Sequence, residues 1–136
     1  MDLFECRKKR LVKDVSIDED KIKSILENSG NKLKASDILP LEESLTNSKI
    51  SLAYDCLREL LEALALRNKL KIYNHECYTA FLKEIVKDST LGDEFDGVRL
   101  IRNSGNYYGK KISMEDCKDT LIKIKELIKK IKDKLK

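Results

Sequence analysis

Residues 113–135 read SMEDCKDTLIKIKELIKKIKDKL and carry the clearest helix signature in the chain. Ser113 with Asp116 three residues later resembles a capping box, in which side-chain oxygens satisfy free backbone N–H groups at a helix start. Apolar residues then recur in steps of four and three, a spacing typical of a seam that packs against neighbouring helices. These positions are Cys117, Leu121, Ile124, Ile128, Ile131 and Leu135. The stretch therefore predicts a long C-terminal helix within a bundle.

Two helices are predicted on either side of Pro40. Ser16 and the acids after it can cap the first helix, which we expect Gly30 to weaken or bend. Pro40 disfavours the helical conformation for the residue before it, so it marks the boundary. The second helix is expected to begin near residue 42 or 48, with an apolar face from Ile50 to Leu64, and the absence of Gly and Pro until well past Leu70 favours a long helix. Its apolar face makes it the expected centre of the core.

Two more helices are predicted before the C-terminal one. Asn74 can cap a third helix, whose apolar face runs from Cys77 to Val86. Residues 91–93 separate it from a fourth helix, which Gly105 and Gly109 are expected to end. In this fourth helix we expect four residues to point inward: Phe95, Val98, Leu100 and Ile101. Five helices with short connections predict an all-α fold, an up-and-down antiparallel bundle of four to five helices.

The length of 136 residues suits one hydrophobic core, so we expect a single domain over residues 1–136. No apolar run approaches the roughly 18 residues that cross a bilayer, and the first residues lack the pattern of a secretory signal. We therefore expect a cytoplasmic protein that makes no membrane contact. Residues 7–10 form a basic cluster. We therefore expect residues 1–15 to be either a flexible basic arm or a frayed end of the chain.

The four cysteines stand far apart, at positions 6, 56, 77 and 117, and His75 is the only imidazole. A zinc site would need closer spacing or more histidines. We therefore expect reduced, mostly buried thiols, no metal and no cofactor. Residues 110–136 hold ten lysines against five acidic residues. These lysines either solvate the outer face of the last helix or form a basic surface for RNA phosphates.

Residues 102–109, RNSGNYYG, gather a guanidinium, two carboxamides and two phenols without an acidic group. Arginine presents a rigid fork of donors to phosphate oxygens, and aromatic rings offer a face to nucleobases. Alternatives stay open, since Arg102 can form an ion pair with an acid of the first predicted helix and the asparagines can end the fourth. The candidate phosphate- or nucleic-acid-binding residues are Arg102, Asn103, Asn106, Tyr107, Tyr108, Lys110 and Lys111.

Three features in order resemble the HEPN superfamily of small helical bundles: a helix with Leu52–Asp55, His75 at the start of the next, and Arg102–Asn103 near the end of another. The resemblance spans residue 18 to the C-terminal helix. The family signature is an Arg, often followed by Asn, with a His four to six residues later. Here Tyr107 or Tyr108 stands in place of the His, and the spacing of Arg102 and Tyr107 resembles a branch that carries Tyr.

The resemblance implies a homodimer in which two Arg-bearing helix ends face each other across a cleft, where nuclease members cut RNA without metal. It also implies a link to minimal nucleotidyltransferases and to toxin–antitoxin modules. Carried onto this chain, it makes Arg102 and Tyr107 the candidate catalytic residues. A tyrosine with an ordinary pKa near ~10 is a poor base at neutral pH, unless Arg102 and Lys110 lower that pKa.

Three hypotheses follow from these residues. The first is a HEPN-like protein that binds RNA or a nucleotide, with catalysis weak or lost. The second is an active metal-independent endoribonuclease, a toxin that a partner silences. The third is a non-catalytic subunit that docks a minimal nucleotidyltransferase through its basic last helix. His75 lies outside the motif, so we expect it to cap a helix or to face solvent, and we expect Tyr54 to pack in the core with its hydroxyl bonded to a neighbour.

Overall fold

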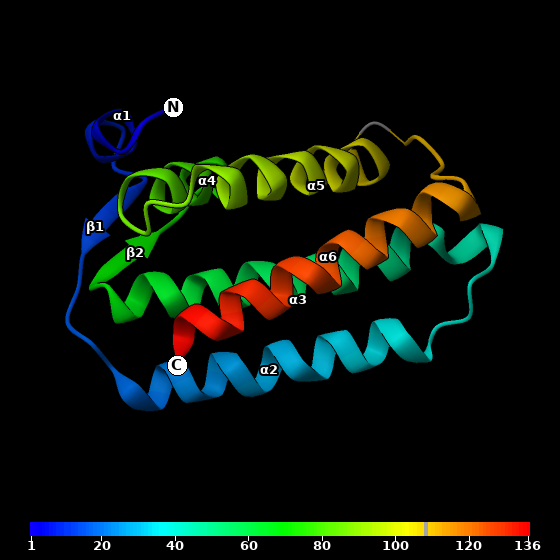
Figure 1. Cartoon of the computed structure of the whole chain (residues 1–136), viewed down its shortest axis with the longest axis horizontal. Helices are drawn as coiled ribbons and strands as arrows, with labels where there is room; N and C mark the ends of the chain where they lie inside the picture. Colours follow the sequence, from blue (N-terminus) through cyan, green and yellow to red (C-terminus); the bar gives the residue numbers. More distant parts are fainter. Residues whose placement is uncertain (108) are drawn as a thin grey trace.

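The computed structural model describes residues 1–107 and 109–136, except for the side chains of residues 106 and 107. The described residues form six α-helices, one short 3-10 helix and two strands (Figure 1). Their bounds are α1 Leu3–Lys8, β1 Val12–Asp14, α2 Glu19–Ile38, η1 Glu43–Leu45, α3 Thr46–Arg67, β2 Leu70–Ile72, α4 His75–Glu84, α5 Ser89–Tyr107 and α6 Met114–Leu135. The predicted all-α helical bundle is confirmed. Within these ranges, no helix combines the length and the apolar character needed to cross a bilayer.

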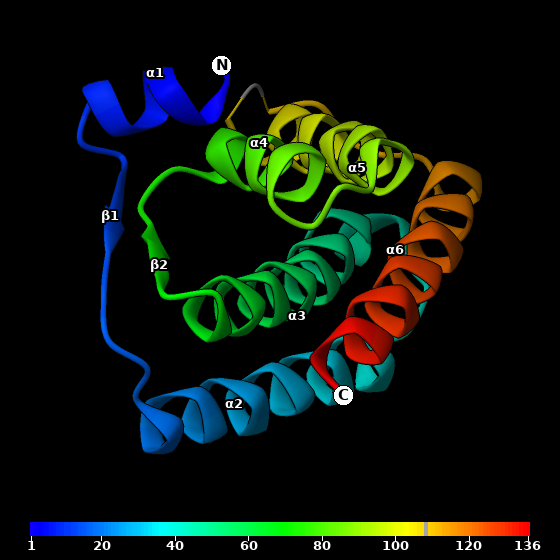
Figure 2. The ribbon, with the colours of Figure 1, turned by 60° about the vertical axis from the view of Figure 1, so that its left-hand side comes forward.

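Helix α3 is the centre of the molecule. Figure 2 shows α2, α6 and the pair α4 and α5 arranged around it. Its buried residues lie on nearly every side from Cys56 to Leu66, and Arg58 and Glu62 are the half-exposed positions in that span. A helix that is apolar around most of its circumference needs neighbours on several sides. The prediction that this helix forms the core is therefore confirmed.

Helix α2 differs from its prediction in two details. Its N-cap is Asp18 rather than Ser16, because the Asp18 carboxylate accepts a hydrogen bond from the backbone N–H of Lys21 at 3.1 Å. The helix also runs straight through Gly30. A glycine on an exposed helix face costs about 1 kcal/mol relative to alanine, which lowers stability without ending a helix that is packed along its other face.

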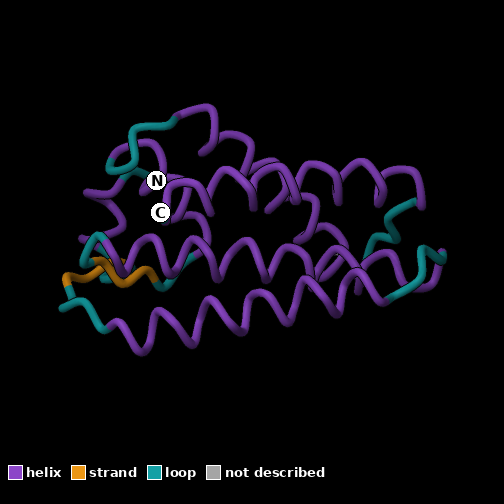
Figure 3. The backbone as a smooth tube through the Cα atoms, turned by 60° about the horizontal axis from the view of Figure 1, so that its bottom comes forward, coloured by secondary structure: helices purple, strands orange, loops and turns teal. Residues whose placement is uncertain are grey.

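The long helix is confirmed, and it ends at Arg67, where strand β2, which the sequence did not predict, follows it. Lys69 adopts a left-handed backbone with a φ of 61° and reverses the chain. Strand β2 then pairs antiparallel with β1, with Val12 opposite Ile72 and Lys13 opposite Lys71. The two strands form a small ribbon at one end of the bundle (Figure 3). Three residues per strand leave too short an alternation to be distinguished from a helix in the sequence.

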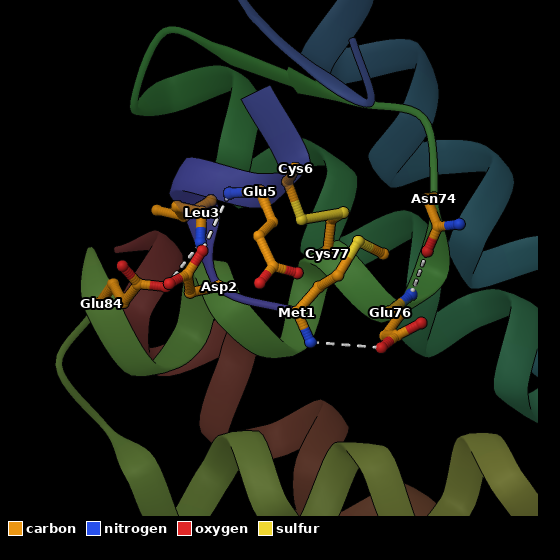
Figure 4. Close-up of a disulfide and its surroundings, with 9 residues drawn as sticks. All are labelled: Met1, Asp2, Leu3, Glu5, Cys6, Asn74, Glu76, Cys77 and Glu84. Atoms are coloured by element: carbon orange, nitrogen blue, oxygen red, sulfur yellow. Dashed lines mark hydrogen bonds and ion pairs between the residues drawn. A yellow bond between two sulfur atoms is a disulfide. The ribbon is translucent and has the colours of Figure 1, made fainter. Parts of the chain in front are cut away.

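The N-terminal segment, which the sequence leaves as a possible arm, forms α1 and β1 and packs on the bundle. Leu3 and Cys6 are buried, and Cys6 forms a disulfide with Cys77 of α4 (Figure 4). The expectation of reduced thiols is therefore wrong for this pair, whereas Cys56 and Cys117 are free and buried as expected. The paired residues are 71 positions apart, and only the fold brings their Cα atoms to 6.2 Å.

Two predicted helix caps are confirmed by their hydrogen bonds. The Asn74 side chain accepts from the backbone N–H of Glu76 at 2.7 Å, which begins α4 at His75. The Ser113 hydroxyl accepts from the backbone N–H of Asp116 at 3.1 Å and begins α6. Both caps satisfy backbone donors that have no partner inside the helix.

Helix α5 begins earlier than predicted, at Ser89, and includes Gly92 and Gly105. The Asp88 carboxylate accepts from the backbone N–H of Leu91 at 3.0 Å and caps it. Residues 91–93 are therefore part of the helix rather than a separator.

The apolar face of α5 is only partly as predicted. Phe95 and Val98 are buried, whereas Leu100 is 55% exposed and Ile101 38% exposed. Both exposed residues lie beside a groove between α5 and α6. The prediction that they point inward is wrong, because α6 does not cover this side of α5.

Candidate functional site

Side chains from three helices meet beside the first turn of α4. The Tyr54 hydroxyl of α3 and the Nδ1 atom of His75 are joined by a hydrogen bond of 3.0 Å. The Arg102 guanidinium of α5 lies 5.1 Å from the centre of the Tyr54 ring. The ring of Tyr54 also stacks on Phe95, with 5.9 Å between the ring centres. Tyr54 thus packs in the core as expected, and its hydroxyl joins His75 of α4 to α3, while Arg102 of α5 lies against its ring.

A shallow polar groove of about 280 Å³ opens next to these residues. Its lining residues are Tyr73, Asn74, His75, Glu76, Arg99 and Asn103, and we call it the His75 groove. The Asn74 cap places residues 74–76 at the N-terminal end of α4, where the helix dipole favours anions. The backbone N–H groups of Glu76 and Cys77 already donate to Asn74. Arg99 and Asn103 lie four residues apart in α5 and therefore share one face of it.

The protonation of the two aromatic groups follows from burial and from nearby arginines. Burial, together with the positive charges of Arg58, Arg102 and Arg99, lowers the pKa of His75 to about 4. His75 is therefore neutral at neutral pH and can accept or donate a hydrogen bond. Burial raises the pKa of Tyr54 above its usual range, against the opposing charge of Arg102, so the phenol keeps its proton.

Carboxylates hold the arginines of α5 in place. Arg99 donates to Asp96 through Nε at 3.0 Å, and its Nη2 lies 2.9 Å from the same carboxylate oxygen. Arg102 Nη2 lies 3.9 Å from Asp55 of α3, and its Nη1 donates to the Asn103 side chain at 3.3 Å. The acid near Arg102 thus belongs to α3 rather than to the first long helix. Arg99 and Asn103 line the groove, whereas Arg102 packs against Tyr54 and Asp55.

The structure separates the predicted site residues into three groups. Arg102 and Asn103 lie at or beside the His75 groove. Lys110 and Lys111 line the other groove, between α5 and α6, and Lys111 pairs with Glu43 at 3.4 Å. The side chains of Asn106 and Tyr107, and the whole of Tyr108, lie outside the described residues.

Sequence reasoning missed His75, Arg99 and Tyr73 as members of this site. Arg99 could have been found, because it precedes Arg102 by three positions and so shares its helix face. The approach of His75 depends on how α4 packs on α5 and α3, and spacing carries no signal for it. In the described part of the chain, no three His, Cys, Asp or Glu side chains gather as ligands for a metal ion.

Lysines of α6 pair with acids of the neighbouring helices. Lys123 and Lys130 contact Glu94 of α5, the second at 3.3 Å. Lys125 lies 2.8 Å from Asp37 of α2, and Lys134 lies 3.4 Å from Asp88. The charges of these four lysines are thus partly offset within the bundle. This favours the interpretation that they solvate and orient α6 over the interpretation that they form a basic surface for RNA.

Comparison with known proteins yields no match. No protein-family model fits the sequence, and no curated protein and no solved structure is significantly similar to the chain. The HEPN-like reading therefore stays a prediction, carried by the residues quoted above and by the helical fold.

Proposed function

We propose that the His75 groove binds a phosphate group of RNA or of a nucleotide. The observation that carries this proposal is that two donors of α5, the Arg99 guanidinium and the Asn103 amide, meet the positive end of the α4 helix dipole on one open polar surface. Guanidinium groups and helix N-termini are the commonest protein partners of phosphate oxygens.

The charge distribution around His75 supports an anionic ligand. Arg58, Arg99 and Arg102 all act on His75 and lower its pKa. A phosphate in the groove would offset this positive charge and would accept hydrogen bonds from Arg99 and Asn103. Glu76 at the groove edge works against an anion, but its carboxylate already faces the N-terminal amine at 3.3 Å.

The resemblance to the HEPN superfamily agrees with a phosphate-binding groove, and our proposal includes it. In that reading the protein is an RNA- or nucleotide-binding component of a toxin–antitoxin or nucleotidyltransferase-linked module, with Arg102–Asn103 at the edge of the binding site. Asp55 and Tyr54 would then orient Arg102 from the core side.

The binding proposal is tested by fluorescence anisotropy with an end-labelled single-stranded RNA of 12 nucleotides. Arg99→Gln should weaken binding by roughly 10- to 150-fold, because a charge-assisted hydrogen bond contributes about 1.5–3 kcal/mol. The slope of the logarithm of the binding constant against the logarithm of the salt concentration should also fall by about 0.7 in this variant, as expected for one lost phosphate contact on a single strand. Lys125→Gln, on α6 beside α2, is the matched loss of one charge and should leave binding unchanged. RNA binding that is absent, or equal in Arg99→Gln, would contradict the proposal.

A second candidate function is metal-independent RNA cleavage, which one observation favours. His75 lies in the same cluster as Arg102, joined to it through Tyr54. A neutral imidazole can accept the proton of the ribose 2′-hydroxyl as its oxygen attacks the phosphorus, while the bond from phosphorus to the 5′-oxygen breaks and water protonates the leaving oxygen. The positive charge of Arg102, which lies behind the Tyr54 ring, would stabilise the charge that develops on the phosphate. The low pKa of His75 weakens it as a base, so we expect slow turnover.

Cleavage is tested with labelled RNA in EDTA. If His75 is the base, the rate should stay flat from about pH 6 to pH 8, because the imidazole with its pKa of about 4 is already deprotonated there. His75→Ala and Arg102→Ala should each abolish it, with Lys125→Ala as the control. Cleavage that both site variants retain would show a contaminating nuclease. If the wild type and all variants fail to cleave RNA, the nuclease function is wrong and only the binding function remains.

We also propose that the protein forms a homodimer. Exposed apolar side chains of α5 support it: Leu100 is 55% exposed and Ile101 38% exposed, and both line a groove of about 570 Å³. A Leu100→Asp variant should shift the mass measured by light scattering from dimer to monomer. A wild-type monomer would contradict the dimer and leave this surface to a partner such as a nucleotidyltransferase.

A further inference from the structure

An exposed aromatic ring stands between two lysines at the edge of the His75 groove. Tyr73 follows strand β2 and is 52% exposed. The ammonium nitrogens of Lys13 and Lys71 each lie 5.8 Å from the centre of its ring. We call these three residues the Tyr73 platform.

The backbone of the ribbon explains how the platform is assembled. Side chains alternate between faces along a strand, so Lys71 and Tyr73 share the outer face while Ile72 is buried. The antiparallel register places Lys13 directly opposite Lys71. The backbone N–H of Tyr73 also donates to the carbonyl of Leu11 at 2.8 Å, which extends the pairing by one residue. Backbone hydrogen bonds of the ribbon therefore hold the ring and the two ammonium groups together.

The platform concentrates positive charge at a cost to the fold. Like charges directly opposite each other on a ribbon are destabilising. A contact with Lys21 of α2 lowers the pKa of Lys71, and Glu62 is the carboxylate that opposes this effect. Glu62 belongs to α3, and the acid of the ribbon itself, Asp14, lies 3.3 Å from Arg7. The positive charges of Lys13, Lys21 and Lys71 thus lie close together and are offset by few carboxylates of the protein, as expected for a surface that binds a polyanion.

The platform and the His75 groove are continuous, because Tyr73 lines that groove together with His75 and Arg99. A chain of nucleotides whose phosphate occupied the groove would bring its next base to the Tyr73 ring. Lys13 and Lys71 would then flank the phosphates on either side of that base.

We propose that the Tyr73 platform stacks an unpaired base, so that the ligand of this protein is single-stranded RNA rather than duplex RNA or a free phosphate. This inference rests on the proposed function of the His75 groove. Bases in a duplex are stacked on one another and cannot offer a face to a protein ring, whereas a single strand can.

The test compares Tyr73→Ala with Tyr73→Phe, which keeps the ring and removes only the hydroxyl. The probes are an end-labelled 12-nucleotide oligouridylate, which stays single-stranded, and a labelled RNA duplex of 12 base pairs. Tyr73→Ala should weaken binding of the single strand by about 5- to 150-fold with an unchanged salt slope, because base stacking carries no charge. Tyr73→Phe should bind the single strand like the wild type. The wild type should bind the duplex more weakly than the single strand.

The lysines are tested with the double variant Lys13→Gln and Lys71→Gln. Its salt slope should fall by about 1.4, because two contacts to single-strand phosphates are lost. Circular dichroism checks that each variant is folded, which we expect because all three side chains lie on the outer face of the ribbon. A double variant with the salt slope of the wild type would overturn the role of the lysines.

The outcomes separate this inference from the proposed function. If Arg99→Gln weakens RNA binding and Tyr73→Ala does not, the platform is wrong and the groove proposal stands. If Tyr73→Ala weakens binding and Arg99→Gln does not, the platform stands and the groove proposal is wrong. If the wild type binds no RNA, both are wrong. A duplex that binds as tightly as the single strand would overturn base stacking.

Discussion

His75 is the only histidine of the chain, so its ionisation can be followed without interference from another imidazole. Its Nδ1 atom is hydrogen-bonded to Tyr54, which leaves Nε2 for a ligand in the groove. Tyr54 is fully buried and keeps its proton, so the pair forms a fixed, neutral hydrogen-bonding unit. The sequence leads us to expect that His75 caps a helix or faces solvent, but Asn74 is the cap of α4 and the His75 ring is bonded to buried Tyr54.

We predict that NMR titration of the His75 ring gives a pKa of about 4, below its ordinary value of 6.5. Burial is the main cause, and the charges of Arg58, Arg102 and Arg99 add to it. Arg58→Gln and Arg102→Gln should each raise this pKa, while Lys125→Gln should not. A wild-type pKa near 6.5 would mean that the ring is solvated and not part of the cluster.

The same shift predicts how stability depends on pH. The folded state holds His75 neutral down to about pH 4, whereas the unfolded chain protonates it below its ordinary pKa of 6.5. The unfolded state therefore binds more protons between these values, and the free energy of unfolding should fall as pH drops from about 6.5 to 4. Urea unfolding should show a weaker dependence on pH in His75→Gln. Equal slopes in both proteins across this window would contradict the prediction.

Among the elements, α5 carries three glycines, of which Gly97 and Gly105 have different surroundings. A Cβ atom at Gly105 would lie 3.0 Å from the Asn47 side chain, whereas a Cβ at Gly97 would meet nothing within 4 Å. Asn47 cannot easily move, because it accepts from the backbone N–H of Ile112 at 3.2 Å and donates to the carbonyl of Lys110 at 3.1 Å. Gly105 is thus a site of close packing, not the helix breaker that the sequence predicts.

We predict opposite effects of alanine at these two positions. Gly97→Ala should stabilise the protein by about 0.5–1 kcal/mol, because alanine favours the helix. Gly105→Ala should be less stable than Gly97→Ala by about 1–3 kcal/mol, the usual cost of overpacking. Urea unfolding of both variants measures the difference. Equal stabilisation by both substitutions would show that the Asn47 side chain can move away and that its hydrogen bonds do not fix the connection to α6.

Elements with strong local signals could be predicted from the sequence. The Ser113 and Asn74 caps and the seam of α6 depend on residues within a few positions of each other, so the pattern was enough. Strand β2 could not be predicted, because it gains its partner only from β1, and β1 lies far away in the chain. For the same reason the sequence indicated Arg102 and Asn103 but not the groove they share with His75.

At the scale of the whole molecule, the Cys6–Cys77 disulfide joins the N-terminal segment to the helix that begins with His75. Helix α1 has six residues, too few to be stable alone, so its contacts to α4 keep it in place. Besides the disulfide, the backbone N–H of Leu3 donates to the Glu84 carboxylate at 2.8 Å. The pairing eluded sequence analysis because cysteines without a motif spacing reveal nothing about which of them meet in the fold.

We predict that reducing this disulfide lowers the free energy of unfolding by about 2–4 kcal/mol, the usual effect of a cross-link that closes a long loop. The unfolded, unreduced protein should expose two titratable thiols, Cys56 and Cys117, and four after reduction. The double variant Cys6→Ser and Cys77→Ser should match the reduced wild type and should not respond to a reductant. Cys117→Ser, which leaves the cross-link intact, should keep the response. Four thiols without reductant, or melting that a reductant leaves unchanged, would show that α1 is held by its packing and hydrogen bonds alone.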